Sequence, residues 1–262
     1  MNRREFLRAT GGLAALGPGA DWQGISLAAG GETVEAGSTL SSWQPGFLDI
    51  HHINTGRGNS ALVLMPDGTS LLIDAGASGT RGAAMNPARP DGSRRPGQWI
   101  ARYIQRQLKA APKIDLDYAL LTHLHGDHIG DVNSESPGST YGGYKLTGIS
   151  DVAEVMPIGK LIDRGYPDYN YPSAVTDATA SNYIQFSRTV VRRGLAVEGI
   201  KVGSSSQIGP LREHGRYPEF GVRIIAGNGR GWDGKGESSA PRFPSQAGVS
   251  AQQLAAARLR FA

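Results

Sequence analysis

Cysteine is absent from the 262 residues of this sequence, which excludes disulfide bonds and metal sites built on thiolates. A metal site here must therefore use nitrogen and oxygen ligands. Apolar runs are short, and none approaches the roughly 20 residues that a membrane-spanning helix needs. The motifs G-x-S-x-G and G-x-x-x-x-G-K-[ST] are also missing, so the sequence lacks the signatures of serine hydrolases and of nucleotide-phosphate loops.

Long runs of one charge are lacking as well. The 27 Lys and Arg residues and 23 Asp and Glu residues give a formal net charge of +4, and basic residues gather only in pairs such as Arg94-Arg95. Basic patches that bind nucleic acids usually contain longer runs, so ordinary solvated faces are the favoured interpretation. With 39% hydrophobic and 19% charged residues the chain is typical of soluble globular proteins, and its length predicts one principal domain.

The first 28 residues read as an export signal rather than as part of the fold. Residues 3–7 are RREFL, and a weakly apolar stretch of glycine and alanine follows, which resembles a twin-arginine signal. A basic amphipathic helix is the alternative, although the glycines and the proline of residues 11–18 would interrupt it. We therefore expect a signal peptide at 1–28, a linker at 29–45, and export by the twin-arginine machinery, so that the protein is periplasmic or secreted.

Hydrophobic patterning divides the remaining chain into short strands and a few helices. Alternating or continuous short apolar runs predict strands, and apolar residues at helical spacing predict helices. The expected strands are 47–53, 61–65, 70–73, 118–121, 158–162, 196–202 and 221–226, and the expected helices are 97–110, 181–193 and 251–261.

Three of the six histidines lie in the stretch THLHGDHIGD, residues 122–131. Alternate side chains of an extended segment share a face. His123 and His125 are therefore expected to converge on one metal ion, while Leu124 points into the core.

The next residue, Gly126, permits a sharp turn because it has no Cβ. That turn would bring Asp127 and His128 back past the end of the strand, to a position that suits a second ion. Imidazole and carboxylate ligands together suit zinc, with iron or manganese as alternatives. The alternative without metal is a histidine-rich surface turn.

At these residues the sequence resembles the metallo-β-lactamase superfamily, whose HxHxDH motif matches residues 123–128. Residues 47–76 and 120–131 look like the branch that includes the hydrolase domain of bacterial DNA-uptake channel proteins. The resemblance implies an α/β fold, the αβ/βα sandwich, over residues 46–232.

The same resemblance implies a site with two ions. It places His123 and His125 on the first ion and Asp127 and His128 on the second. It also gives Asp74 a supporting role beside the metal loop, without ligating; the alternative for this residue is a turn position at the end of a strand.

The chemistry expected from such a site is hydrolysis of an ester, amide or phosphodiester. A divalent ion lowers the pKa of a bound water to about 7 and polarises a carbonyl or phosphoryl oxygen. Asp127 is the catalytic candidate, because a ligating carboxylate can also orient that water.

Downstream, the sequence offers few of the ligands that full members of the superfamily supply. After His128 the only histidine is His214, and Asp163 is the best placed carboxylate because it follows an expected strand. Both are retained as candidate ligands. Residues 233–262 form an atypical low-complexity tail, so the second half of the sandwich is expected to be incomplete. The alternative function is a degenerate or truncated metal-binding relative with little or no catalytic activity.

Substrate and partners depend on the loops around the ions. The aromatic loop 166–171 is the candidate wall of the site, and the alternative is that it only packs the surface. Binding of nucleic acid rests on analogy with uptake proteins and is the weaker expectation, because aromatic and basic residues are not interleaved as in single-strand grooves.

Overall fold

The computed structural model describes residues 41–56, 58–77, 91–171, 173–213 and 215–242. Contacts divide the chain into the units Met1–Ser41 and Ser42–Ala262, and all elements given below belong to the second unit. The expected signal peptide, His214 and the expected helix 251–261 lie outside the described residues.

Six strands form one mixed sheet in the order of the sequence. They are β1 (Asp49–His52), β2 (Ala61–Leu64), β3 (Ser70–Ile73), β4 (Leu116–Leu121), β5 (Ile158–Asp163) and β6 (Ala196–Gly199). The pairs β1/β2 and β2/β3 are antiparallel, whereas β3/β4, β4/β5 and β5/β6 are parallel. The carboxyl ends of the parallel strands therefore meet at one edge of the sheet, which is where ligands bind in open α/β sheets.

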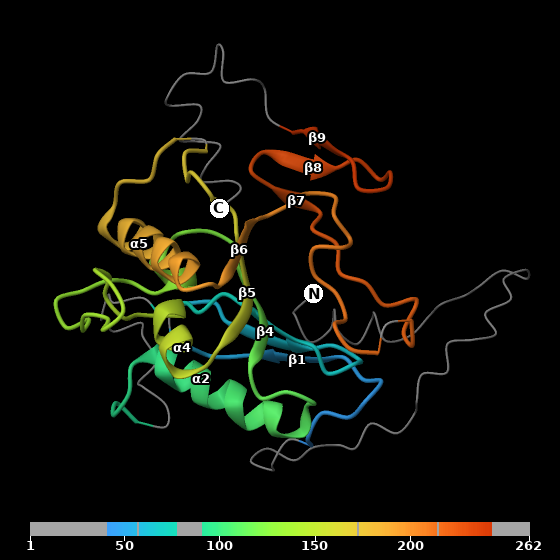
Figure 1. Ribbon diagram of the computed structural model, residues 1–262, viewed down its shortest axis with the longest axis horizontal. Coiled ribbons are helices and arrows are strands. Elements are labelled where there is room, and N and C mark those ends of the chain that lie inside the picture. The colour runs from blue at the N-terminus through green and yellow to red at the C-terminus, as the bar shows by residue number, and fades with distance from the viewer. Residues whose placement is uncertain (1–40, 57, 78–90, 172, 214, 243–262) are drawn as a thin grey trace, which may run out of the picture. The chain divides into compact units, whose positions relative to one another are not determined.

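The connections between the parallel strands contain the helices. These are α2 (Pro96–Gln107) with the 3-10 turn η1 (Leu108–Ala110), α3 (Gly126–Ile129), α4 (Ile149–Val155) and α5 (Ala178–Arg192). Right-handed crossovers that advance in one direction along a sheet leave their helices on one face. The helices α2, α4 and α5 do pack against a common face (Figure 1). None of the described helices has the length and apolar character needed to cross a membrane.

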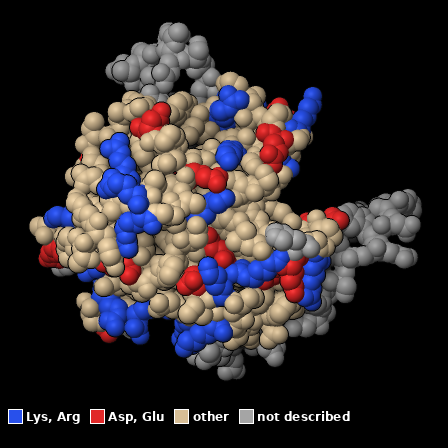
Figure 2. All heavy atoms as spheres, in the orientation of Figure 1, with Lys and Arg blue, Asp and Glu red and all other residues tan. Residues whose placement is uncertain are grey.

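Surface charge is mixed on the face that Figure 2 presents. Blue basic side chains and red acidic side chains both occur across that face, and a band of blue side chains runs down its left part. This distribution agrees with the mixed charge order of the sequence.

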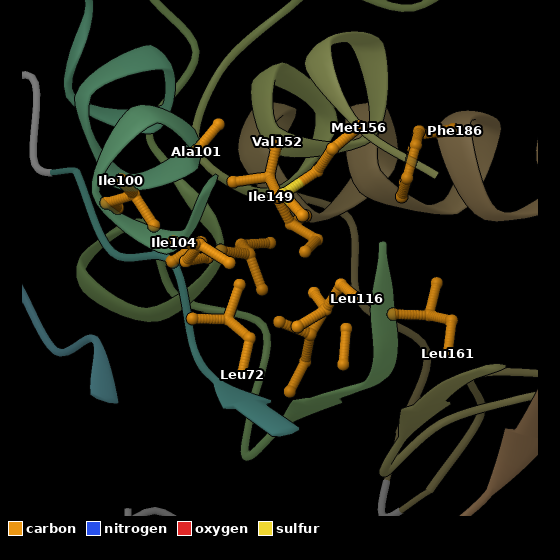
Figure 3. Close-up of a cluster of buried hydrophobic side chains, with 14 of the residues drawn as sticks. Leu72, Ile100, Ala101, Ile104, Leu116, Ile149, Val152, Met156, Leu161 and Phe186 are labelled. Atoms are coloured by element: carbon orange, nitrogen blue, oxygen red, sulfur yellow. The ribbon is translucent and has the colours of Figure 1, made fainter. Parts of the chain in front are cut away.

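The main core lies between the sheet and the helices. Because side chains of a strand alternate between faces, Leu72 of β3 and Leu161 of β5 point toward the helices. There they meet apolar residues such as Ile104 of α2, Val152 of α4 and Phe186 of α5 (Figure 3), all three fully buried or nearly so. Burying one such side chain contributes about 1.5–3 kcal/mol, so this layer holds the strand ends in place.

The other face of the sheet has a smaller apolar cluster. Leu71, Tyr118 and Ile162, the alternate residues of β3, β4 and β5, pack there with Ile208 and with partly buried residues of the segment 200–222. A separate sheet of three short antiparallel strands follows: β7 (Ala226–Gly227), β8 (Arg230–Trp232) and β9 (Ser239–Pro241). The central mixed sheet with its helices confirms the expected α/β fold class.

The structure differs from the expected secondary structure in the segment 221–226 and in four elements that were not expected: α3, α4, β8 and β9. The expected strand 221–226 exists only at its end, as β7, because Ile224 pairs its backbone with Gly203 and Ser204 instead of with a continuous strand. The helix α4 was not expected, since its seven residues follow a glycine- and serine-rich segment that hides its apolar spacing. Its buried Ile149 and Val152 show that tertiary packing stabilises it.

The expected domain boundaries stay predictions. Trp43, in the expected linker 29–45, is only 6% exposed and packs in the main core. The three-stranded sheet runs across the expected boundary between residues 232 and 233, since β8 lies before it and β9 after it.

Candidate metal centre

The histidine stretch begins where β4 ends. Leu121 is the last residue of β4, and His125 precedes the short helix α3 as its N-cap. Leu124, between His123 and His125, is 6% exposed and belongs to the main core, which confirms its predicted inward direction. A buried leucine thus anchors a segment whose imidazoles remain accessible from the sheet edge.

Three potential ligands come together at this point. Ligand atoms of His123, Asp127 and His128 all lie within 4.8 Å of one another, and we call these residues the ligand cluster. The ring of His125 is 4.7 Å from the ring of His123, centroid to centroid. Two imidazoles and a carboxylate form a donor set that fits a divalent ion such as zinc.

Asp74, the residue after β3, accepts hydrogen bonds that orient Thr122 and His128. Its Oδ1 accepts a hydrogen bond from the Thr122 backbone N–H at 2.8 Å, and its Oδ2 accepts one from the Thr122 hydroxyl at 2.8 Å. The same Oδ2 lies 2.7 Å from Nδ1 of His128. A neutral His128 that donates from Nδ1 to this carboxylate keeps the lone pair on Nε2, which lies 3.7 Å from Oδ2 of Asp127.

Backbone hydrogen bonds clamp the loop that carries the cluster. The Asn59 N–H donates to the carbonyl of Asp127 at 2.7 Å, and the Ala75 N–H donates to the carbonyl of His128 at 2.8 Å. Gly76 bridges the two clamping segments, because its N–H donates to the carbonyl of Asn59 at 2.8 Å. No local sequence pattern predicts these supports; the glycine directly after Asp74 and Ala75 is the available signal.

Gly126 is needed for a reason other than the predicted turn. Its backbone is helical, as the first residue of α3, and it is not among the residues with positive φ. A Cβ at this position would lie 1.5 Å from Oδ1 of Asp131. The absence of a side chain therefore makes room for a carboxylate that packs on the loop.

The surroundings of His123 favour its neutral form. Burial is the main cause that lowers the pKa of His123 to about 4, and the neighbouring imidazoles of His128 and His125 act in the same direction. His123 is therefore neutral at neutral pH, which is the form that binds metal. Burial raises the pKa of Asp74, although the hydrogen bonds from Thr122 and His128 oppose that change.

Asp163 ends β5 at the same edge, but its carboxylate is fully buried and is not part of the ligand cluster. Oδ1 accepts hydrogen bonds from the backbone N–H groups of Gly165 and Tyr166, both at 2.7 Å. Oδ2 accepts from the hydroxyls of Tyr169 at 2.9 Å and Tyr183 at 2.6 Å. A metal ion would have to displace these donors, so a ligand role for Asp163 stays a prediction, as does that of His214.

The aromatic loop 166–171 divides between interior and surface. Tyr169 is 4% exposed and joins the main core, whereas Tyr171 is 44% exposed. The Tyr171 carbonyl accepts a hydrogen bond from Nη2 of Arg164 at 2.9 Å. One part of the loop thus packs in the core, and another part is exposed and is hydrogen-bonded to Arg164 at the end of β5. Its role as a wall of the site stays a prediction.

Comparison with known proteins gave a match to one family model. No curated protein and no solved structure matches this chain. A family model matches about a third of the chain. Residues 53–134, which contain β2, β3, β4, Asp74 and the whole ligand cluster, match the model of the metallo-beta-lactamase superfamily.

Proposed function

We propose that this protein is a metal-dependent hydrolase that holds two zinc ions at the ligand cluster and His125 and acts on an ester, amide or phosphodiester. The observation that carries the proposal is the convergence of His123, Asp127 and His128 within 4.8 Å, with His128 oriented by the buried Asp74. When bound, the ions supply a Lewis acid and a water whose pKa is lowered. The family match over residues 53–134 supports a hydrolase.

Each residue of the proposed site has a separate role in hydrolysis. His123 presents the lone pair of a neutral imidazole, and Asp74 fixes the ring of His128 so that Nε2 faces Asp127. Asp127, whose side chain is 53% exposed, is accessible to solvent and orients the attacking water. Hydrolysis then adds the hydroxyl to the carbonyl carbon or phosphorus, and the proton leaves with the departing group.

A metal-binding relative with little catalysis is the second candidate. Among the described residues, the ligand cluster is the one group of three or more such side chains close enough to hold an ion. The buried Asp163 is already saturated with hydrogen bonds from the protein. Binding without turnover is what a site with too few fixed ligands would produce.

Metal content and turnover together test the proposal. We expect His123→Ala to bind fewer zinc ions than the wild type by elemental analysis, because it removes a ligand. His52→Ala, which removes an exposed histidine of β1 outside the cluster, should retain the wild-type content. Asp74→Asn should weaken zinc affinity about 10–100-fold through loss of the charged partner of His128.

Equal metal content in the His123→Ala and wild-type proteins would overturn the assignment of His123 as a metal ligand. Full zinc loading without hydrolysis of bis(para-nitrophenyl) phosphate or para-nitrophenyl acetate would favour the second candidate over the first. Two ions with turnover of either reporter would support the hydrolase.

We also propose that the protein is exported by the twin-arginine machinery and acts in the periplasm or outside the cell. The RREFL sequence at residues 3–7 supports this proposal. That route transports folded proteins, which suits a protein that acquires its metal before export.

A further inference from the structure

A basic residue lies at the same sheet edge as the ligand cluster. Arg164 directly follows Asp163, the last residue of β5, and Asp163 is in parallel register with Leu121 of β4. Arg164 therefore emerges beside Thr122 and His123, the residues that follow Leu121. Nothing in the sequence links residue 164 to the histidine stretch; the strand register alone brings them together.

The backbone and side chain of Arg164 are both held. Its guanidinium Nη2 donates to the Tyr171 carbonyl at 2.9 Å, and its own carbonyl accepts a hydrogen bond from Nδ2 of Asn228 at 2.6 Å. The following turn is fixed because Oδ1 of Asp163 accepts from Gly165. An arginine positioned in this way loses less conformational entropy on binding a ligand than a freely moving one.

The charge of Arg164 reaches the cluster. It lies near enough to His123 for the two groups to interact electrostatically. A fixed cation this close also opposes the binding of divalent metal ions by Coulomb repulsion. An anion that bound to both the guanidinium and the ions would offset that repulsion.

We propose that Arg164 is the residue that selects a substrate with an oxyanion beside the scissile bond, binding that group while the ligand cluster holds the metal. The proposal rests on the hydrolase function proposed above and narrows its substrate class. A guanidinium fork matches the geometry of both carboxylate and phosphate oxygens. The oxyanion is therefore either a phosphodiester itself or a carboxylate next to an ester or amide.

Three reporters distinguish these sources. We compare bis(para-nitrophenyl) phosphate, the mono-para-nitrophenyl ester of succinic acid, and the neutral para-nitrophenyl acetate. Arg164→Gln should raise KM about tenfold for the anionic reporter that fits, with a smaller change in kcat, and should leave the neutral ester unaffected. Arg164→Lys keeps the charge without the fork and should fall between the two. Arg106→Gln removes an exposed arginine of α2 as the matched control.

A binding measurement separates failure of this proposal from failure of the hydrolase proposal. Calorimetric titration with diethyl phosphate and with succinate is made on metal-free and zinc-loaded protein, with circular dichroism and zinc content as checks on the fold. Arg164→Gln should weaken binding of at least one anion about tenfold in at least one form, even if no reporter is hydrolysed. Equal anion affinity of the wild type and Arg164→Gln in both forms, or no binding by the wild type, would overturn the role of Arg164.

Discussion

Gly76 shows how little space separates the metal loop from the strand that supports it. A Cβ at residue 76 would lie 1.7 Å from the carbonyl oxygen of Asp127 and 2.7 Å from the backbone nitrogen of Asn59. Both are backbone atoms, which cannot move aside as the end of a flexible side chain can. The position of Asp127 therefore depends on the absence of a side chain at Gly76.

Gly76→Ala should lower the free energy of unfolding by about 3 kcal/mol and weaken zinc binding at least about tenfold, because the loop must shift to admit the methyl group. Urea unfolding and zinc titration measure the two effects. Gly221→Ala is the control, since nothing lies within 4 Å of the Cβ it would add. Similar effects of the two substitutions would contradict this account of the loop.

The sequence predicted the candidate ligand residues better than the backbone hydrogen bonds that hold their loop. The spacing within residues 122–131 was sufficient to nominate His123, His125, Asp127 and His128, because all four lie on one strand end and the turn after it. The structure groups His123 with Asp127 and His128, and His125 is not part of that ligand cluster. The clamp by Asn59 and Gly76 involves residues more than 45 positions away in the chain, so no local pattern could reveal it.

Strand β6 is an edge strand of the six-stranded sheet, and an ion-pair group secures it. Glu198 of β6 accepts a hydrogen bond from Gln207 Nε2 at 3.0 Å, and its carboxylate lies 3.0 Å from Nζ of Lys160 on β5 and 3.2 Å from Nζ of Lys201. The hydrogen bonds from Gln207 and Lys160 lower the pKa of Glu198 to about 2. The ionised carboxylate is therefore favoured in the folded state.

This lowered pKa predicts how the stability of the protein depends on pH. A folded-state pKa of about 2 against an ordinary value of 4.5 means that Glu198 contributes fully above pH 4.5 and loses its contribution as the pH falls toward 2. Glu198→Gln should lower the free energy of unfolding by about 1 kcal/mol at neutral pH, a modest amount because water screens the pairs.

Urea unfolding of the wild type and Glu198→Gln between neutral and strongly acidic pH checks the prediction. The difference between the two proteins should shrink toward zero as the pH approaches 2. Glu154→Gln, which removes an exposed carboxylate from α4, is the matched control. A difference that stays constant across the acid range would contradict the ionic contribution of Glu198.

The strands of the six-stranded sheet and the helices α2 and α5 were predictable because their apolar residues form short runs or recur at helical spacing. The continuous buried run in β3 and the helical spacing in α2 and α5 each include several residues that face the core. Helix α4 was missed and the strand 221–226 was wrong for the same reason. In both segments, neighbouring parts of the fold decide the backbone conformation, and the local pattern is weak.

The proposed export signal concerns the location of the whole protein. The proposed export route depends on the two arginines in RREFL, which the twin-arginine machinery recognises. Replacing Arg3 and Arg4 together by lysine should trap the precursor inside the cell. Cell fractionation with detection of the protein measures the distribution, and a variant in which Arg8 alone is replaced by lysine is the control. Normal export of the double variant would contradict the proposal.

The sequence alone determined the strands of the central sheet, the candidate donor residues and the family resemblance from which the fold class was expected. Apolar patterns and short spacing depend only on neighbouring residues. The tertiary structure decided which distant residues meet at the sheet edge. Register between β4 and β5 pairs Asp163 with Leu121, so that Arg164 and the histidine stretch leave the sheet at the same edge, and packing turns Asp163 inward to Tyr169 and Tyr183. Strand pairing and burial are long-range interactions, so their outcome is set by the folded chain as a whole.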